Sequence, residues 1–207
     1  MDRGQTRGVR RGSILASAVM NLIASYPRLL IAHAELAPEQ RLNLLFHRWA
    51  IKELTMPTLG WLENHMEHCA TMAEWLHTQF TYEFQPQPLR AWEEEFAQGQ
   101  HDGAWKCLIA FEGERLLGGA CLAADDLPAR EELGPWLACV YVAPDARGRG
   151  LAAELIEGIC AQAKATGVRT LYLHTHDQRE YYAKRGWAAI EPFERWGKAH
   201  WLMSRAL

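Results

Sequence analysis

The clearest chemical signal in the chain is a hexapeptide, Arg-Gly-Arg-Gly-Leu-Ala, at residues 147–152. It lies between an apolar run at 136–142 and an amphipathic segment at 151–165, which predicts a strand, a tight turn and a helix. The first N–H groups of a helix lack intrahelical acceptors and, with the helix dipole, attract anions. The two glycines allow close backbone approach to a ligand, and the two arginines suit phosphate oxygens. The predicted phosphate- or pyrophosphate-binding residues are Arg147, Gly148, Arg149, Gly150, Leu151 and Ala152.

Two common phosphate motifs do not fit this turn. A P-loop requires a Lys-Ser or Lys-Thr pair after its last glycine, and the dinucleotide fingerprint requires a third glycine, which is absent here. The pattern Arg-x-x-Gly-x-Ala, which directly follows Val-Tyr-Val-Ala-Pro, resembles instead the acetyl-CoA signature of the GNAT superfamily of N-acyltransferases, Gln/Arg-x-x-Gly-x-Gly/Ala. A second likeness is Tyr-Tyr-Ala-Lys-Arg-Gly-Trp at 181–187, which is similar to that family's aromatic-Tyr-x-x-x-Gly-aromatic element.

The resemblance implies acetyl-CoA as co-substrate and gives roles to particular residues. The turn is expected to bind the CoA pyrophosphate, and the strand end at Val140, Tyr141 and Val142 to pair with the pantetheine amides like an added strand. The strand is expected to splay from the next one over residues 139–142, which leaves a backbone N–H free to polarise the thioester carbonyl. Tyr182 matches the tyrosine that protonates the departing thiolate, whereas Tyr181 is expected to pack.

No residue stands out as the base that would deprotonate the attacking amine. Many relatives carry a Glu in the strand before the turn, but residues 136–142 hold no carboxylate. Glu131 and Glu132 precede that strand and could act through water, although the sequence favours an ordinary solvated loop as the role of each. His174 and His176 follow in the next strand and titrate in a useful range. Either is a base or a surface residue, and a water chain is a further alternative.

Composition limits the classes of partner. The chain has 207 residues, 49% of them hydrophobic, and a net charge of −3, so it can bury a sizeable core. Residues 1–55 carry eight Lys/Arg and four Asp/Glu, whereas residues 56–207 carry fourteen and twenty-one. The acidic second part argues against nucleic acid and is compatible with a cationic substrate, or simply with solubility. Five scattered cysteines without a Cys-x-x-Cys pattern predict free thiols in a reducing compartment, and the histidine spacings predict no metal site.

The order of expected elements from residue 56 onward is β-α-α-β-β-β-α-β-α-β-β. It resembles the GNAT fold, an α/β architecture with a mixed, twisted sheet flanked by helices. The second helix is expected over 88–97, with Gly99 just past its end. The expected segments are strands at 59–62, 105–111, 116–122, 136–142, 170–175, 187–190 and 199–203, and helices at 66–80, 88–97, 151–165 and 178–185.

Residues 1–55 form an N-terminal extension, helical or disordered, before an acetyltransferase domain at 56–207. Four arginines precede an apolar run at 14–24, which resembles a targeting segment, but the run is broken and too short to span a membrane. The extension is otherwise a helical appendage or upstream sequence from an early start, since Met56 directly precedes the first expected strand.

The leading interpretation is a cytoplasmic, acetyl-CoA-dependent N-acetyltransferase that acts on a primary amine of a small molecule by direct attack in a ternary complex. Neither nucleic acid, membrane nor metal is expected as a partner, and a homodimer is left open. One alternative is acetylation of a protein lysine or N-terminus. Another is a non-catalytic module that binds and senses acyl-CoA, which the missing strand carboxylate keeps open.

Overall fold

The computed structural model describes residues 40, 56–83 and 87–207. The chain divides into two compact units, Met1–Met56 and Pro57–Leu207, and the elements below belong to the second. The three interpretations of the N-terminal extension concern residues 1–55, which apart from Gln40 lie outside the described residues.

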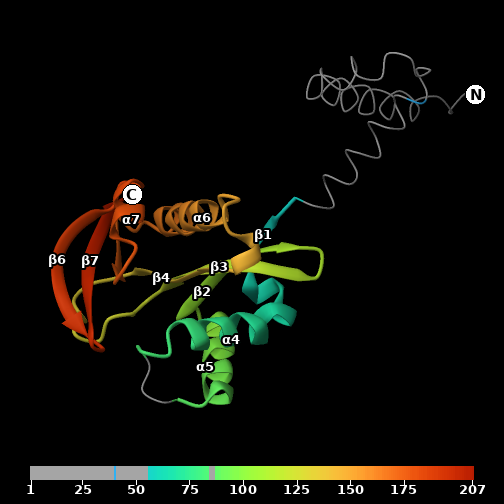
Figure 1. The fold of residues 1–207 in the computed structure, drawn as a ribbon, viewed down its shortest axis with the longest axis horizontal. Helices are drawn as coiled ribbons and strands as arrows, with labels where there is room; N and C mark the ends of the chain where they lie inside the picture. The colour runs from blue at the N-terminus through green and yellow to red at the C-terminus, as the bar shows by residue number, and fades with distance from the viewer. Residues whose placement is uncertain (1–39, 41–55, 84–86) are drawn as a thin grey trace, which may run out of the picture. The chain divides into compact units, whose positions relative to one another are not determined.

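The second unit is a seven-stranded mixed sheet with helices on both faces, as expected from the sequence (Figure 1). The strand order is β1-β2-β3-β4-β5-β7-β6, and every neighbouring pair is antiparallel except β4 and β5. The elements are β1 (Thr58–Trp61), α4 (Cys69–Gln79), α5 (Leu89–Asp102), β2 (Trp105–Glu112), β3 (Arg115–Ala123), β4 (Trp136–Val142), α6 (Leu151–Ala165), β5 (Thr170–Thr175), α7 (Arg179–Ala183), β6 (Ala188–Arg195) and β7 (Lys198–Ala206).

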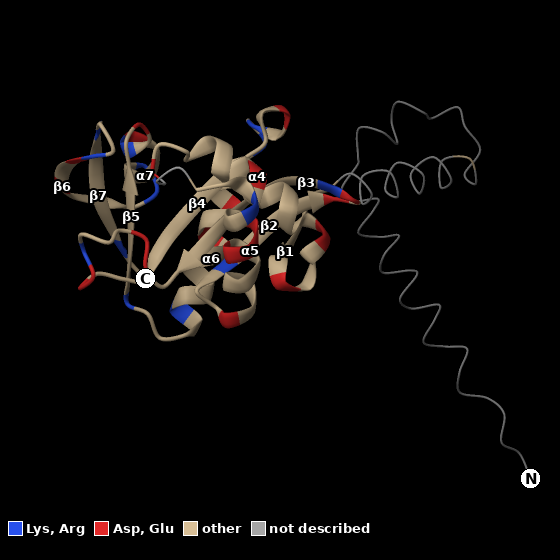
Figure 2. Cartoon of the chain, turned by 90° about the horizontal axis from the view of Figure 1, so that it is seen from below, with Lys and Arg blue, Asp and Glu red and all other residues tan. Residues whose placement is uncertain are grey.

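The sheet separates two hydrophobic cores. In Figure 1, α6 covers one face and α4 and α5 cover the other. Because successive strand residues point to opposite faces, β2 sends Leu108 and Ala110 into the α6 core and Cys107 and Ile109 into the α4–α5 core. The strands at the centre of the sheet are almost entirely tan in Figure 2, which means that they carry few charged residues; the red and blue residues lie mostly on helices and turns. A central sheet buried on both faces gives β4 and β5 a rigid frame.

The predicted end of the second helix was wrong. Helix α5 runs on through Gly99 to Asp102 and ends at Gly103, which has the left-handed conformation of a helix cap (φ +83°). Gly99 is inside the helix because Trp105 packs against it: a Cβ at Gly99 would lie 2.6 Å from Trp105 Cδ1. The glycine is required for close packing and does not terminate the helix.

All five cysteines are free, and four of them are buried, as the sequence predicted; Cys139 is half-buried. The last two strands are longer than the apolar runs that predicted them, because β6 and β7 continue as a hairpin to Arg195 and Lys198. Within the described residues, no helix combines the length and the apolar character needed to cross a bilayer.

Candidate active site

Strand β4 changes direction at a β-bulge in its middle. Cys121 of β3 faces Ala138 and Gly119 faces Tyr141, so two residues of β4 lie opposite Ala120 alone. Cys139, the first of these two residues, has φ +56°, which is rare for a residue with a side chain. A bulge bends the strand that carries it and increases its twist. The second half of β4 is thereby directed differently from the first half.

Two adjacent glycines of β3 lie beside this bend, Gly118 against β4 and Gly119 against Met72 of α4. A Cβ at Gly118 would lie 2.5 Å from the carbonyl oxygen of Tyr141 and 3.0 Å from Val142 Cα. A Cβ at Gly119 would lie 2.8 Å from Met72 Cε. Glycine inside a strand typically marks a bulge or a close approach of two backbones. Gly118 and Gly119 were not singled out in the sequence, although two adjacent glycines in an apolar strand are a signal that could have predicted the bulge.

In the described part of the chain, β4 and β5 pair only at the start of β4, ahead of the bulge. Their parallel ladder joins one Cα pair in the described part of the chain, Trp136 with Tyr172, next to a hydrogen bond from the Tyr172 N–H to the Pro135 carbonyl (3.1 Å). From Cys139 onward the edge of β4 that faces β5 is therefore open. The splay expected over residues 139–142 is present, and it exposes backbone N–H and C=O groups to whatever occupies the gap.

The gap opens into a cavity of about 820 Å³. That volume is in the range of cavities that hold small-molecule ligands. Its lining comes from the end of α4 and the following loop, the β3–β4 loop, β4, the start of α6, the segment from β5 into α7, and the β6–β7 turn. Among the lining residues are Gln79, Phe80, Tyr82, Glu83, Asp126, Cys139, Val140, Tyr141, Val142, Arg147, Ala152, His174, His176, Asp177, Tyr181, Tyr182, Arg195 and Trp196.

The turn between β4 and α6 has the backbone conformation of an anion cradle. Gly148 (φ +78°) and Gly150 (φ +86°) are both left-handed, and Gly150 caps α6. A Cβ at Gly148 would meet no atom within 4 Å, so the surface beside it is open to a ligand. Ala153 and Glu154 donate to the Gly150 carbonyl at 2.9 and 3.2 Å, so the helical hydrogen bonds begin there. The N–H groups that precede them point out of the helix end and can accept an anion.

The two arginines of the turn are placed differently. Arg147 lines the cavity, and its Nε donates to the Val142 carbonyl at 3.0 Å, which ties the turn to the end of β4. Arg149 is in an ion pair with Glu112 at the end of β2 and is not among the cavity-lining residues. The structure thus brings Val140, Tyr141, Val142, Arg147 and Ala152 together around the cavity. Gly148, Arg149 and Gly150 form the exposed rim of the turn, and Leu151 is buried in the core beneath it.

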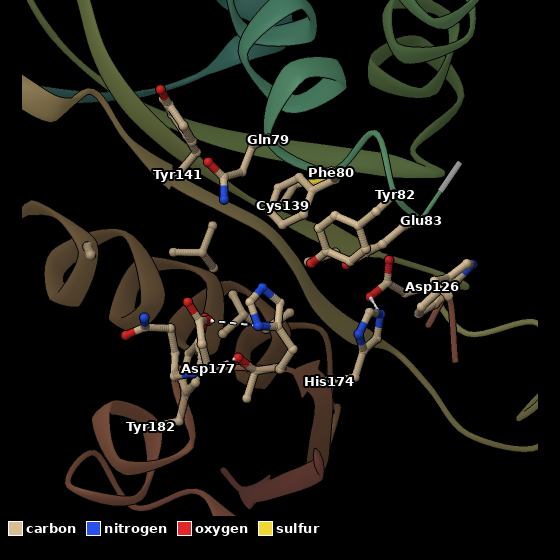
Figure 3. A pocket seen from close by; sticks show the side chains of 18 of the residues that line it. Gln79, Phe80, Tyr82, Glu83, Asp126, Cys139, Tyr141, His174, Asp177 and Tyr182 are labelled. Carbon is tan, nitrogen blue, oxygen red and sulfur yellow. Dashed lines mark hydrogen bonds and ion pairs between the residues drawn. The ribbon is translucent and has the colours of Figure 1, made fainter. Parts of the chain in front are cut away.

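Tyr182 lies on α7, directly after β5, and lines the same cavity (Figure 3). Its side chain is 8% exposed and contacts Tyr181 and Trp187 edge to face, with ring centroids 5.5 and 6.1 Å away. Burial raises the pKa of Tyr182 above its ordinary value, because a phenolate would lose its hydration. The hydroxyl therefore stays protonated at neutral pH and can act as a donor.

The other end of the cavity holds a carboxylate–imidazole pair. His174 Nε2 lies 3.2 Å from Asp126 Oδ2, and the two side chains are 6% and 15% exposed. Burial lowers the pKa of His174, but the hydrogen bond to Asp126 and the charges of Asp126 and Glu83 outweigh burial, so the net shift is upward. Both ring nitrogens of His174 are buried without a well-aligned hydrogen bond among the described residues: Nε2 has the 3.2 Å contact with Asp126, and Nδ1 has no hydrogen-bond partner.

Three residues at this end were not predicted from the sequence, namely Tyr82, Glu83 and Asp126. Glu83 is half-buried, and burial raises its pKa despite the opposing effects of the His174 charge and a Tyr82 hydrogen bond. The candidate bases Glu131 and Glu132 are exposed and do not line the cavity. His176 lines it, with Nδ1 3.8 Å from Asp177. Loop carboxylates carry no spacing signal, so only the fold could show which of them face His174.

The sequence matches a family model and, over a shorter stretch, a curated relative. The model of the acetyltransferase (GNAT) family matches residues 69–187. N-alpha-acetyltransferase 80 of Mus musculus is 47% identical over 55 residues, which is 27% of this chain. The matched stretch spans only 18% of that relative's length.

Solved structures share the fold at low sequence identity. An N-acetyltransferase from Staphylococcus aureus Mu50 superposes with a TM-score of 0.57 and 18% identity, over 73% of this chain and 99% of that one. A Salmonella typhimurium protein solved with its cofactor acetyl-CoA superposes with a TM-score of 0.57 and 16% identity, over 73% and 94%. At such identities the likeness establishes the arrangement of the sheet and helices.

Proposed function

The chain belongs to the acetyltransferase (GNAT) family, and from this premise we propose that it transfers the acetyl group of acetyl-CoA to the primary amine of a small molecule. The observation that carries the proposal is the divergence of β4 from β5 directly beside the glycine turn. An open strand edge, a helix N-terminus and a cavity of about 820 Å³ meet there. This is the arrangement that a long amide-containing thioester with a pyrophosphate requires.

Backbone groups would hold acetyl-CoA. The open edge of β4 at Val140 to Val142 would pair with the pantetheine amides as an added strand does. The N–H groups from Gly148 to Ala152 would receive the pyrophosphate, with Arg147 beside them. A free N–H on the same edge would polarise the thioester carbonyl, and such a fixed donor favours the charge that develops on the oxygen during attack.

Tyr182 is proposed as the acid that assists thiolate departure. As the C–N bond forms and the C–S bond breaks, its hydroxyl proton passes to the sulfur, and the phenol recovers a proton from solvent. Burial supports this role because it keeps the hydroxyl protonated until the thiolate charge appears.

His174 is proposed as the base that accepts the proton of the attacking amine. Asp126 lies 3.2 Å from its Nε2, and Nδ1, which has no hydrogen-bond partner among the described residues, would receive the proton. Because the pair raises the pKa of His174, the neutral imidazole that a base requires is present only at a pH above the ordinary value of about 6.5. The reaction is therefore expected to lose rate as the pH falls.

Two measurements test the proposal together. Calorimetry with acetyl-CoA should show one binding site, and thiol release against a panel of small amines should show turnover that depends on both substrates. Absence of acetyl-CoA binding to the folded protein would overturn the cofactor assignment. Binding without thiol release for any amine would favour the alternative of an acyl-CoA sensor. The proposed reaction belongs in the cytoplasm, where acetyl-CoA is available.

Acetylation of a protein N-terminus is a second candidate, favoured by the local identity to N-alpha-acetyltransferase 80. The same assay with short peptides in place of small amines separates the two candidates. A kcat/KM for a free peptide N-terminus well above that of every small amine would establish the second candidate.

A further inference from the structure

The acceptor end of the cavity is rich in carboxylates. Tyr82 and Glu83 approach it from the loop after α4, Asp126 from the β3–β4 loop, and His174 from the end of β5, as Figure 3 shows. Asp125 and Asp177 also line the cavity. The loop after α4, the β3–β4 loop and the end of β5 are far apart in the sequence, so it is the fold that brings these carboxylates together.

The carboxylates at this end are not paired alike, and Asp177 lies 3.8 Å from His176 Nδ1. Asp126 is paired with His174, but Glu83 has no ion pair with a lysine or arginine among the described residues. Two nearby cations lie on aromatic rings instead. Arg195 is 4.7 Å from the Trp196 ring centroid, and Lys198 Nζ is 3.4 Å from that of Tyr82. The half-buried Glu83 lines the cavity, and its charge is left without a lysine or arginine partner among the described residues.

A second, independent observation points to a ligand at the same place. His174 is a polar side chain that is 6% exposed and lines the cavity, and its Nδ1 has no partner among the described residues. A buried polar atom without a partner is costly unless water or a ligand satisfies it. An amine whose reacting nitrogen donates to Nδ1 would satisfy it.

We propose that the acceptor carries a second positively charged group, which Glu83 binds while the first amine attacks beside His174. The proposal rests on the proposed acetyl transfer and specifies its substrate class as small diamines and related polycationic amines. A carboxylate withdrawn from water interacts more strongly with a cation than an exposed carboxylate does.

The test compares linear diamines with monoamines of equal chain length. We expect kcat/KM for the best diamine to exceed that of its matched monoamine at least ~10-fold, as a hydrogen-bonded charge typically provides. Glu83→Gln should reduce this ratio toward one. Glu131→Gln, which removes a carboxylate from an exposed position of the β3–β4 loop, should leave the ratio as it is in the parent. A ratio near one in the parent, or a ratio that Glu83→Gln leaves intact, would overturn the proposal.

A binding measurement keeps the test independent of turnover. Calorimetry of the CoA-loaded full chain should show tighter binding of the diamine than of the monoamine, and Glu83→Gln should remove the difference. If no amine is turned over while this difference is found, acetyl transfer to small amines fails but the second-cation site stands. Equal affinities, or a preference for a peptide that begins with acidic residues, would refute the site.

Discussion

The two ends of the cavity are constructed differently. The end beside β4 and α6 comes from one continuous stretch, residues 136–152, and it offers mainly backbone groups: the open edge of β4 and the N–H groups around Gly150. The end beside His174 comes from four separate stretches and offers side chains, among them Glu83 and Asp126. A site made of backbone groups suits an acyl carrier whose structure is always the same. A pocket made of side chains can be altered by substitution to fit a different acceptor.

The difference has a consequence for mutation. A cradle made of backbone is sensitive to residues that alter φ or fill the approach path, and insensitive to the loss of most side chains. A pocket made of side chains is sensitive to the loss of single charged or polar groups. Tyr182, which lines the cavity from α7, should show the largest effect of all, because it is assigned to the chemical step.

Tyr182→Phe should lower turnover about 10²–10⁴-fold while acetyl-CoA affinity changes little. The substitution removes one hydroxyl from a side chain whose ring packing is retained. Tyr181→Phe makes the same change on the neighbouring ring, which also lines the cavity, and should leave turnover close to that of the parent. Near-normal turnover of Tyr182→Phe under conditions where chemistry limits the rate would return Tyr182 to a packing role.

Gly150→Val should weaken acetyl-CoA binding at least ~10-fold, or ~1.4 kcal/mol, measured by calorimetry. A β-branched residue is strained at φ +86° and blocks the approach to the turn. Gly167 has the same φ and open surroundings at the other end of α6, so Gly167→Val serves as a control for the strain alone. Equal affinities in the two variants would mean that the turn is not the pyrophosphate site.

Asp126→Asn should move the acid limb of the kcat/KM profile to lower pH. In the parent, Asp126 raises the pKa of His174, so the base becomes neutral only at higher pH; without that carboxylate, burial lowers the pKa. Glu131→Gln, in the same loop, should leave the limb in place. An unchanged limb in Asp126→Asn would exclude His174 as the titrating base.

The smallest effect is expected from removal of residues 1–55. A chain that starts at Met56 retains every described element that lines the cavity. Its turnover and solubility should therefore match those of the full chain. Loss of either would show that the extension contributes to the core or to the pocket, and would require the domain boundary to be redrawn.

The strand, the glycine turn and the helix start at 136–152 could be predicted from the sequence because their signal is local. Within seventeen residues, an apolar run, two glycines and an amphipathic segment indicate the backbone conformation directly. The order of strands and helices followed from the periodicity of apolar residues. Glu83 and Asp126 could not be predicted, since nothing local distinguishes them from Glu131 or Glu132. They lie near His174 only in the folded chain, where the loop after α4 and the β3–β4 loop both line the cavity at the end of β5. Gly99 was misread for a related reason: its packing partner, Trp105, lies in another element.

The most direct test of the account is amide hydrogen exchange with and without acetyl-CoA, measured on the full chain at saturating ligand. Two segments should become protected: the open edge of β4 at 139–142 and the turn at 148–152. The loop at 79–83 should change little until an amine is added together with CoA. Protection that misses both β4 and the turn in a protein that binds acetyl-CoA would contradict the backbone cradle.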